Sequence, residues 1–286
     1  MSMVQELVAL LQVEQLERNL FRGVSADVGS PAVFGGQVLG QALMAASRTV
    51  QDRTVHSLHA YFLRPGDKQA PIVYDVDRIR DGSSFTTRRV VAIQHGRPIF
   101  NTSISFQMHE EGVEHQCAMP EVPPPESLPD AAHARLKAAE QLPEALRDRY
   151  ARKRPIETRE ISPVDLLHPQ PRAAAPAAWV RAPDALPDDP FLHQAMLAYA
   201  SDFNLLQAAL MPHAMSYVQS DLHIASLDHA MWFHRPFRMD EWLLYVTDSP
   251  SASNARALCR GSFFSRDGRL VASTAQEGLI RQRAPR

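Results

Sequence analysis

The chain repeats one pattern twice, and this internal duplication limits its possible folds more than any other feature. Each half opens an apolar helical stretch with matching aromatic and glutamine positions, at Phe34–Gln37 and at Phe191–Gln194. Each helical stretch is followed by a β-like run that ends in Arg-Pro, and the last two β-like runs of each half are joined by a tight Gly-Arg turn. We therefore expect two copies of one helix-and-strand unit.

Each copy is predicted to contain one long helix followed by a four-stranded antiparallel meander, with an additional strand before the helix. The predicted strands are 14–24, 55–63, 72–79, 85–94 and 99–108 in the first copy, and 156–162, 224–234, 242–247, 256–265 and 270–280 in the second. Long antiparallel strands around one apolar helix describe a hotdog fold. The predicted class is therefore α+β, a double hotdog, and an unrelated pair of α+β domains is the alternative.

A proline-rich stretch separates the two copies. Five prolines lie between Cys117 and Pro129. Proline fixes φ and offers no backbone donor, so this stretch is predicted to be an extended linker, followed by a short helix over 131–149. We expect an N-terminal hotdog domain at 1–115, a linker at 116–155 and a C-terminal hotdog domain at 156–286, with the two sheets paired edge to edge.

Composition and missing motifs exclude several classes of function. The net charge of −2 and the two cysteines disfavour a nucleic-acid partner, a disulfide framework and a cysteine-rich metal site. No secretory signal and no apolar run of membrane-spanning length occurs, so we expect a cytoplasmic protein without a membrane partner. The chain also lacks a nucleophile-elbow serine, phosphate-binding glycine loops and a His-Glu-x-x-His motif. No cofactor and no metal is predicted.

Three polar residues interrupt apolar patterns in the second copy. Asp202 lies in the middle of the second helical pattern, where aspartate has low helix propensity and costs free energy to bury. Ser226 begins the following strand, and Gln276 lies in the final strand. Taken singly, each is also compatible with a helix cap, a strand end or a surface position.

Comparison of the two copies turns these residues into a candidate site. The first copy carries apolar residues at the three matching places, which are Ala45 for Asp202, Val55 for Ser226 and Ile104 for Gln276. One active site, in the second copy, is therefore expected. A carboxylate, a hydroxyl and a carboxamide around one water can orient it and deprotonate it for attack on a thioester carbonyl. Partial burial is expected to raise the pKa of the carboxyl group.

Four motifs resemble the acyl-CoA thioesterase II (TesB) family, and together with the linker they extend the resemblance over nearly the whole chain. They are residues 33–42, 59–67, 228–236 and 271–278. The resemblance implies a double hotdog that hydrolyses acyl-CoA to free fatty acid and CoA without a covalent acyl-enzyme, over a broad, medium- to long-chain acyl range. It assigns water activation to Asp202, Ser226 and Gln276, with Ser226 where many bacterial members have threonine. It also implies a homo-oligomer, either a dimer or a tetramer.

Two further residues are candidate accessory groups. His59 alternates with Ser57 and Tyr61 along its strand and is placed to face the cleft, or else is a structural histidine at the interface of the two halves. Asp228 lies on the Ser226 side of its strand and is expected to support that hydroxyl. Gly35 and Gly36 are expected to serve helix packing rather than catalysis.

Other functions and the binding surface stay open at this level. A hotdog acyl-CoA hydratase or dehydratase would need a histidine beside Asp202, and none occurs in the helical motif; a non-catalytic acyl-binding module is a second alternative. Candidate residues for the wall of an acyl tunnel are Met196, Phe203, Met231, Trp232 and Phe233. The 30 scattered lysines and arginines leave no choice of residues for the nucleotide of CoA.

Overall fold

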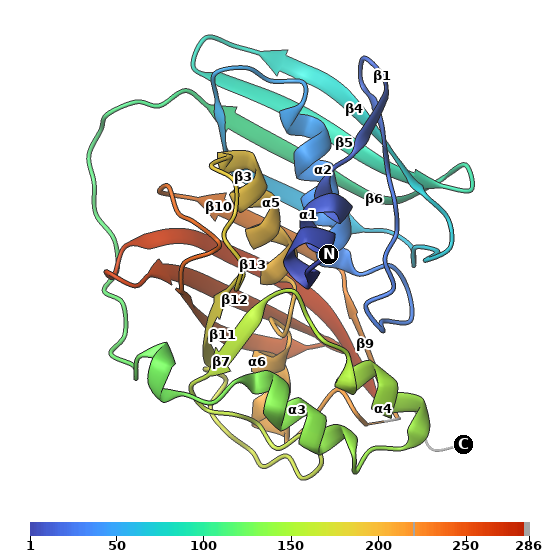
Figure 1. Cartoon of the computed structure of the whole chain (residues 1–286), viewed down its shortest axis with the longest axis vertical. Helices are drawn as coiled ribbons and strands as arrows, with labels where there is room; N and C mark the ends of the chain where they lie inside the picture. Colours follow the sequence, from blue (N-terminus) through green and yellow to red (C-terminus); the bar gives the residue numbers. More distant parts are fainter. Residues whose placement is uncertain (220, 283–286) are drawn as a thin grey trace.

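The computed structural model describes residues 1–219 and 221–282 and has the predicted double hotdog architecture (Figure 1). The first half contains α1 (Met3–Leu11), β1 (Glu14–Glu17), β2 (Leu20–Gly23), α2 (Gly35–Ser47), β3 (Thr54–Phe62), β4 (Ile72–Asp81), β5 (Phe85–Gln94) and β6 (Arg97–Gln107). The linker contains a short 3-10 turn (Pro125–Ser127), α3 (Ala131–Ala139) and α4 (Glu144–Ala151). The second half contains β7 (Glu157–Glu160), β8 (Ala177–Arg181), α5 (Pro190–Ser201), α6 (Gln207–Leu210), a 3-10 turn (Met211–His213), β9 (Leu222–Ser226), β10 (Asp228–Phe233), β11 (Leu243–Ser253), β12 (Arg256–Ser265) and β13 (Leu270–Gln282).

One antiparallel sheet runs through both halves in the order β1-β2-β4-β5-β6-β3-β10-β13-β12-β11-β8-β7, and β9 pairs with β13. The halves join where β3 pairs with β10, with Leu58 opposite Met231, so the predicted edge-to-edge pairing is confirmed. The predicted simple meander is wrong in one respect. Strand β3 pairs with β6 rather than with the next strand β4, which leaves its other edge free to meet the second half.

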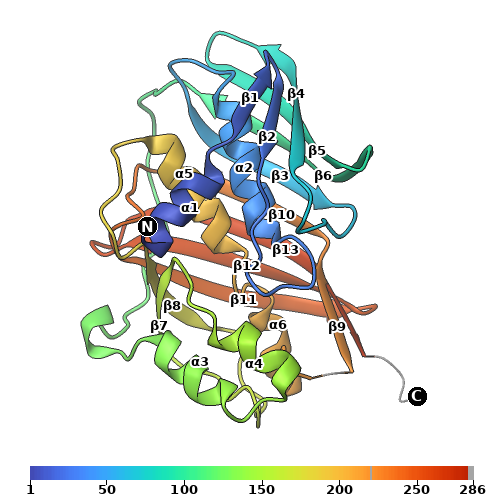
Figure 2. The ribbon, with the colours of Figure 1, turned by 45° about the vertical axis from the view of Figure 1, so that its right-hand side comes forward.

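Several predicted elements divide where the backbone must turn. The range 14–24 forms a hairpin of β1 and β2, and the range 224–234 divides at Leu227 into β9 and β10. The predicted linker helix is two helices, because Pro143 stands before α4 and supplies no N–H to continue α3. In Figure 2 both linker helices lie at one end of the molecule, below the sheet of the second half. The domain limits at 115 and 155 stay a prediction.

No helix within residues 1–219 and 221–282 combines the length and the apolar character needed to cross a membrane.

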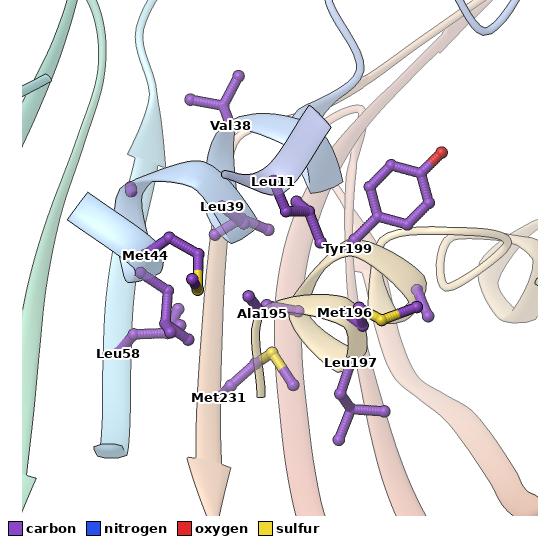
Figure 3. Packing of buried hydrophobic residues seen from close by; sticks show 14 of the residues in the cluster. Leu11, Val38, Leu39, Met44, Leu58, Ala195, Met196, Leu197, Tyr199 and Met231 are labelled. Atoms are coloured by element: carbon purple, nitrogen blue, oxygen red, sulfur yellow. The ribbon is translucent and has the colours of Figure 1, made fainter. Parts of the chain in front are cut away.

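The two long helices, α2 and α5, pack directly against each other at the centre of the molecule (Figure 3). Gly40 makes this approach possible, since a Cβ there would lie 2.9 Å from the carbonyl oxygen of Ala195 and 2.6 Å from Leu11 Cδ2. Small residues lie on both sides of this contact, Gly40 on α2 and the fully buried Ala195 on α5. Protein interiors are close-packed, so the helix separation is fixed by these small residues.

We predict that Gly40→Val lowers the free energy of unfolding by about 1–3 kcal/mol, because the added side chain meets a backbone carbonyl that cannot rotate away. Chemical denaturation monitored by circular dichroism would measure the change. Gly112→Val is the matched control, since a Cβ at that exposed position meets nothing within 4 Å. Equal stability of the two variants would contradict a packing limit at Gly40.

Candidate active site

Asp202 closes helix α5 instead of lying within it. The helix ends at Ser201, Asp202 is its C-terminal cap, and Asn204 takes a left-handed conformation with φ 59°. The apolar pattern continues to Leu205 and therefore predicts a helix that is longer than α5. Asparagine tolerates this left-handed conformation, in which the helix cannot continue, whereas aspartate is favoured at helix N-termini and not at C-termini.

The carboxylate of Asp202 is held by groups from both halves of the chain. The Gly36 N–H donates to Oδ2 at 2.9 Å, and Ser226 Oγ donates to Oδ1 at 3.4 Å. Gly36 lies in the first turn of α2, where unpaired N–H groups carry a partial positive charge. The first copy of the hotdog thus contributes a donor to the site of the second.

Gly36 is also required for packing, as predicted, because a Cβ there would meet the carbonyl oxygen of Tyr199 on α5. A Cβ on Gly35 would lie 2.7 Å from Asp202 Oδ2. The prediction that these glycines serve packing alone misses the bond from Gly36 to the carboxylate. The residue type is needed twice, once for helix contact and once for access of a backbone donor to Asp202.

A chain of hydrogen bonds extends from Ser226 into the core. Gln276 Nε2 donates to Ser226 Oγ at 2.8 Å, and Gln276 Oε1 is bonded to His229 Nδ1. His229 Nε2 lies 2.9 Å from Ser201 Oγ. An amide oxygen only accepts, so Nδ1 carries the proton in this network, and in the neutral ring Nε2 is an acceptor. The Ser201 hydroxyl beside Nε2 also lies 2.9 Å from the Ala198 carbonyl oxygen. The imidazole therefore sets the direction in which the carboxamide of Gln276 faces the serine.

The hydrogen-bond network adds His229 to the predicted site residues, and the sequence carries a signal for it. Aligning the two Arg-Pro motifs places His229 over Leu58, which pairs directly with Ile104 in the first half. Leu58 and Ile104 are fully buried, as are His229 and Gln276. A polar pair in the second copy thus replaces an apolar pair in the first.

Burial shifts the pKa values of Asp202 and His229 in the directions that favour the neutral form of each side chain. It raises the pKa of Asp202 above its ordinary value, against the opposing effects of His229, the Gly36 N–H, Gln276 and Ser226. It lowers the pKa of His229 below its ordinary value, against the opposing effect of Asp202. Asp202 is half-buried and borders the cleft. His229 is fully buried and does not border the cleft that the described residues form.

A cleft of about 1560 Å³ opens onto Asp202, Ser226 and Gln276. Its wall comes from α1, from the loop before α2, from the end of the linker and from β9. Apolar residues on this wall include Leu7, Leu10, Phe34, Phe62, Leu206 and Ile224. Of the residues predicted to line an acyl tunnel, Phe203 alone borders this cleft, while Met196 and Met231 are fully buried in the core.

The two predicted accessory residues, His59 and Asp228, do not join the hydrogen-bonded group around Asp202. His59 is exposed on β3, where its ring lies edge-on to Trp232 with centroids 5.3 Å apart, at the junction of the two halves. It does not border the cleft that the described residues form. Asp228 Oδ1 accepts the Glu277 N–H at 2.6 Å, so it holds the backbone beside Gln276 rather than the hydroxyl of Ser226.

Comparisons with known proteins cover both halves of the chain. A family model described as "Acyl-CoA thioesterase" matches residues 150–279, and one described as "Acyl-CoA thioesterase N-terminal domain" matches 24–107. Acyl-CoA thioesterase 2 of Haemophilus influenzae is 42% identical over 98% of this chain and 98% of that protein. Human acyl-coenzyme A thioesterase 8 is 42% identical over 96% of this chain and 88% of its own length. The crystal structure of acyl-CoA thioesterase II TesB2 from Mycobacterium marinum is 46% identical, with a TM-score of 0.80 over 97% of this chain and 99% of that one.

We predict that His229 is neutral at pH 7 with its proton on Nδ1, because burial disfavours the imidazolium and Gln276 Oε1 requires a donor. ¹⁵N NMR of histidine-labelled protein distinguishes the two tautomers and the charged ring. The exposed His59 gives a reference signal in the same spectrum. An imidazolium signal from His229 at pH 7, or a proton on Nε2 alone, would contradict the assigned hydrogen-bond direction.

Proposed function

This chain belongs to the acyl-CoA thioesterase family, and from that premise we propose that it hydrolyses acyl-CoA by direct attack of a water that Asp202 deprotonates and that Ser226 and Gln276 orient. The observation that supports this most is the convergence of a carboxylate, a hydroxyl and a carboxamide on one cleft. These are the groups that a water needs for positioning and for loss of a proton.

The proposed reaction needs no covalent intermediate. Asp202 takes a proton from the water, the water oxygen forms a bond to the thioester carbon, and the carbon–sulfur bond then breaks. The thiolate of CoA is a good leaving group, and it receives the proton from Asp202. Gln276 donates to Ser226, and Ser226 donates to Asp202, so the serine side chain is held for orientation rather than released for attack.

The environment of Asp202 suits a general base that works near neutral pH. Burial makes the carboxylate a stronger base than an exposed aspartate, while the Gly36 N–H and the Ser226 hydroxyl stabilise its charged form. The positive end of α2 acts in the same direction. The Asp202 carboxylate thereby stays in its charged form and still binds a proton more strongly than an exposed aspartate does.

A hydratase or dehydratase is less well supported, although a histidine does lie near Asp202. The absence of histidine from the helical motif is not by itself decisive, since His229 approaches from strand β10. His229 is fully buried behind Gln276 and does not border the described cleft, so it has no access to the carbons of an acyl chain. Proton transfer to a substrate carbon requires such access.

The finer properties of the enzyme are also proposals. The size of the cleft and its apolar wall support a broad, medium- to long-chain acyl range. A homo-oligomer and a cytoplasmic location stay predictions from the family resemblance and the sequence.

We predict that Asp202→Asn lowers kcat by about 10²–10⁴-fold, because the amide cannot take the proton of water. Release of free thiol from short-, medium- and long-chain acyl-CoAs measures both the loss and the acyl preference. Asp248→Asn is the control, since the half-exposed Asp248 lies on β11 and is paired with Arg260. Full turnover in Asp202→Asn would move water activation elsewhere. No turnover in the unmodified protein would favour an acyl-binding module, and an enoyl product would favour a hydratase.

The rate should also rise with pH and level off above the pKa of Asp202, because the base must be deprotonated. Burial raises that pKa, so the acidic limb of kcat/KM is expected above the ordinary aspartate value of 3.8. Ser226→Ala removes a donor that stabilises the carboxylate, so the limb should move to higher pH. A limb that moves to lower pH in this variant, measured in constant-ionic-strength buffers, would contradict the assignment.

A further inference from the structure

The end of the linker forms part of the cleft wall and brings basic side chains to it. Arg152, Lys153 and Arg154 border the cleft just before the second hotdog begins, and Arg135 of helix α3 joins them. The same cleft opens onto Asp202. The linker is thus more than a tether between two domains.

Three of these cations have no ion-pair partner among the described residues. Arg152 is committed to Asp27, with Nη2 3.4 Å from Oδ2. Within residues 1–219 and 221–282, Arg135, Lys153 and Arg154 form neither a hydrogen bond nor an ion pair. We call these three residues the linker cations.

Arg154 is the most enclosed of the linker cations. Its guanidinium carbon lies 5.0 Å from the centroid of the Phe203 ring. Burial, together with the neighbouring charge of Arg135, lowers the pKa of Arg154 to about 10, so it stays charged at neutral pH. Desolvating a cation without a partner is costly, and an anion bound from solution would repay that cost.

The nearby acid does not neutralise the group. Glu160 is the carboxyl that acts on both Arg135 and Arg154, but burial raises its own pKa and it forms no ion pair with either arginine in the described part of the chain. Asp130 also acts on Arg135, but it forms no ion pair with it in the described part of the chain. Arg135, Arg154 and the exposed Lys153 outnumber these two acids, and burial disfavours the charged form of one of them, Glu160. The linker side of the cleft therefore carries excess positive charge.

We propose that the linker cations Arg135, Lys153 and Arg154 bind the phosphate groups of the CoA nucleotide, an inference that rests on the proposed function. Guanidinium groups match phosphate oxygens in pairs, and lysine adds a point charge. CoA carries its phosphates at the end remote from the thioester. The pantetheine arm would then run from the linker cations to the thioester at Asp202, within the one cleft that both border.

Phosphate fits this cluster better than a carboxylate on the acyl chain. A single carboxylate would need one cation, whereas the pyrophosphate and the 3′-phosphate together present several negative charges. The cluster also extends from the enclosed Arg154 to the exposed Lys153, as expected for a headgroup that lies partly outside the cleft.

The test compares one acyl group on three carriers that carry successively fewer phosphates: CoA, 4′-phosphopantetheine and N-acetylcysteamine. In Arg154→Gln and, separately, Arg135→Gln, the ratio of kcat/KM for acyl-CoA to that for the acyl-N-acetylcysteamine thioester should fall about tenfold, mainly through KM for acyl-CoA. Added salt should weaken acyl-CoA binding less in the variants than in the unmodified enzyme. Arg266→Gln is the control, because Arg266 is exposed and paired with Glu126.

The outcomes separate this inference from the proposed function. An unchanged ratio in both variants, including an equal loss on all three carriers, would overturn phosphate binding and leave a structural role. A loss confined to substrates with a carboxylate on the acyl chain would also overturn it and assign Arg154 to acyl recognition. Failure of the proposed function would appear differently, as unmodified protein that hydrolyses none of the thioesters or as full activity in Asp202→Asn.

Discussion

The close contact of helices α2 and α5 is the constraint on which the rest of the structure depends. Gly40 against Ala195 sets how near the helices lie, and the same contact places Gly36 beside the end of α5. With larger residues at these positions, the N-terminus of α2 would stand away from Asp202, and the carboxylate would lose its backbone donor. Packing in the core thus fixes the electrostatics of the site.

The site itself is a balance between burial and donors. Asp202 sits at the C-terminal end of its own helix, where a negative charge is disfavoured, and at the N-terminal end of the other helix, where it is favoured. Burial pushes the carboxyl toward its neutral form, and Gly36, Ser226 and Gln276 push it back. His229 is bonded to Gln276 and is fully buried, so in the proposed mechanism it is a positioning residue rather than a catalytic one.

Duplication has given the two copies different tasks. The first copy carries the apolar pair Leu58 and Ile104 where the second carries His229 and Gln276, yet it supplies the helix terminus that donates to Asp202. It is therefore not a passive scaffold. The linker adds a third contribution, because its last residues form part of the cleft wall. Their positive charge is opposite to that of a phosphate group.

The sequence by itself determined the duplication, the two apolar helices, most of the long strands and the candidates Asp202, Ser226 and Gln276, because these follow from local periodicity and from comparing one half with the other. It did not determine that α5 ends at Ser201, that β3 lies at the centre of the sheet, or that strand 224–234 divides at Leu227. Those outcomes depend on pairing between distant segments. Only the tertiary structure brought His229, Gly36 and the linker cations to the site, since each is ordinary in its own segment and gains its role from neighbours far away in the chain.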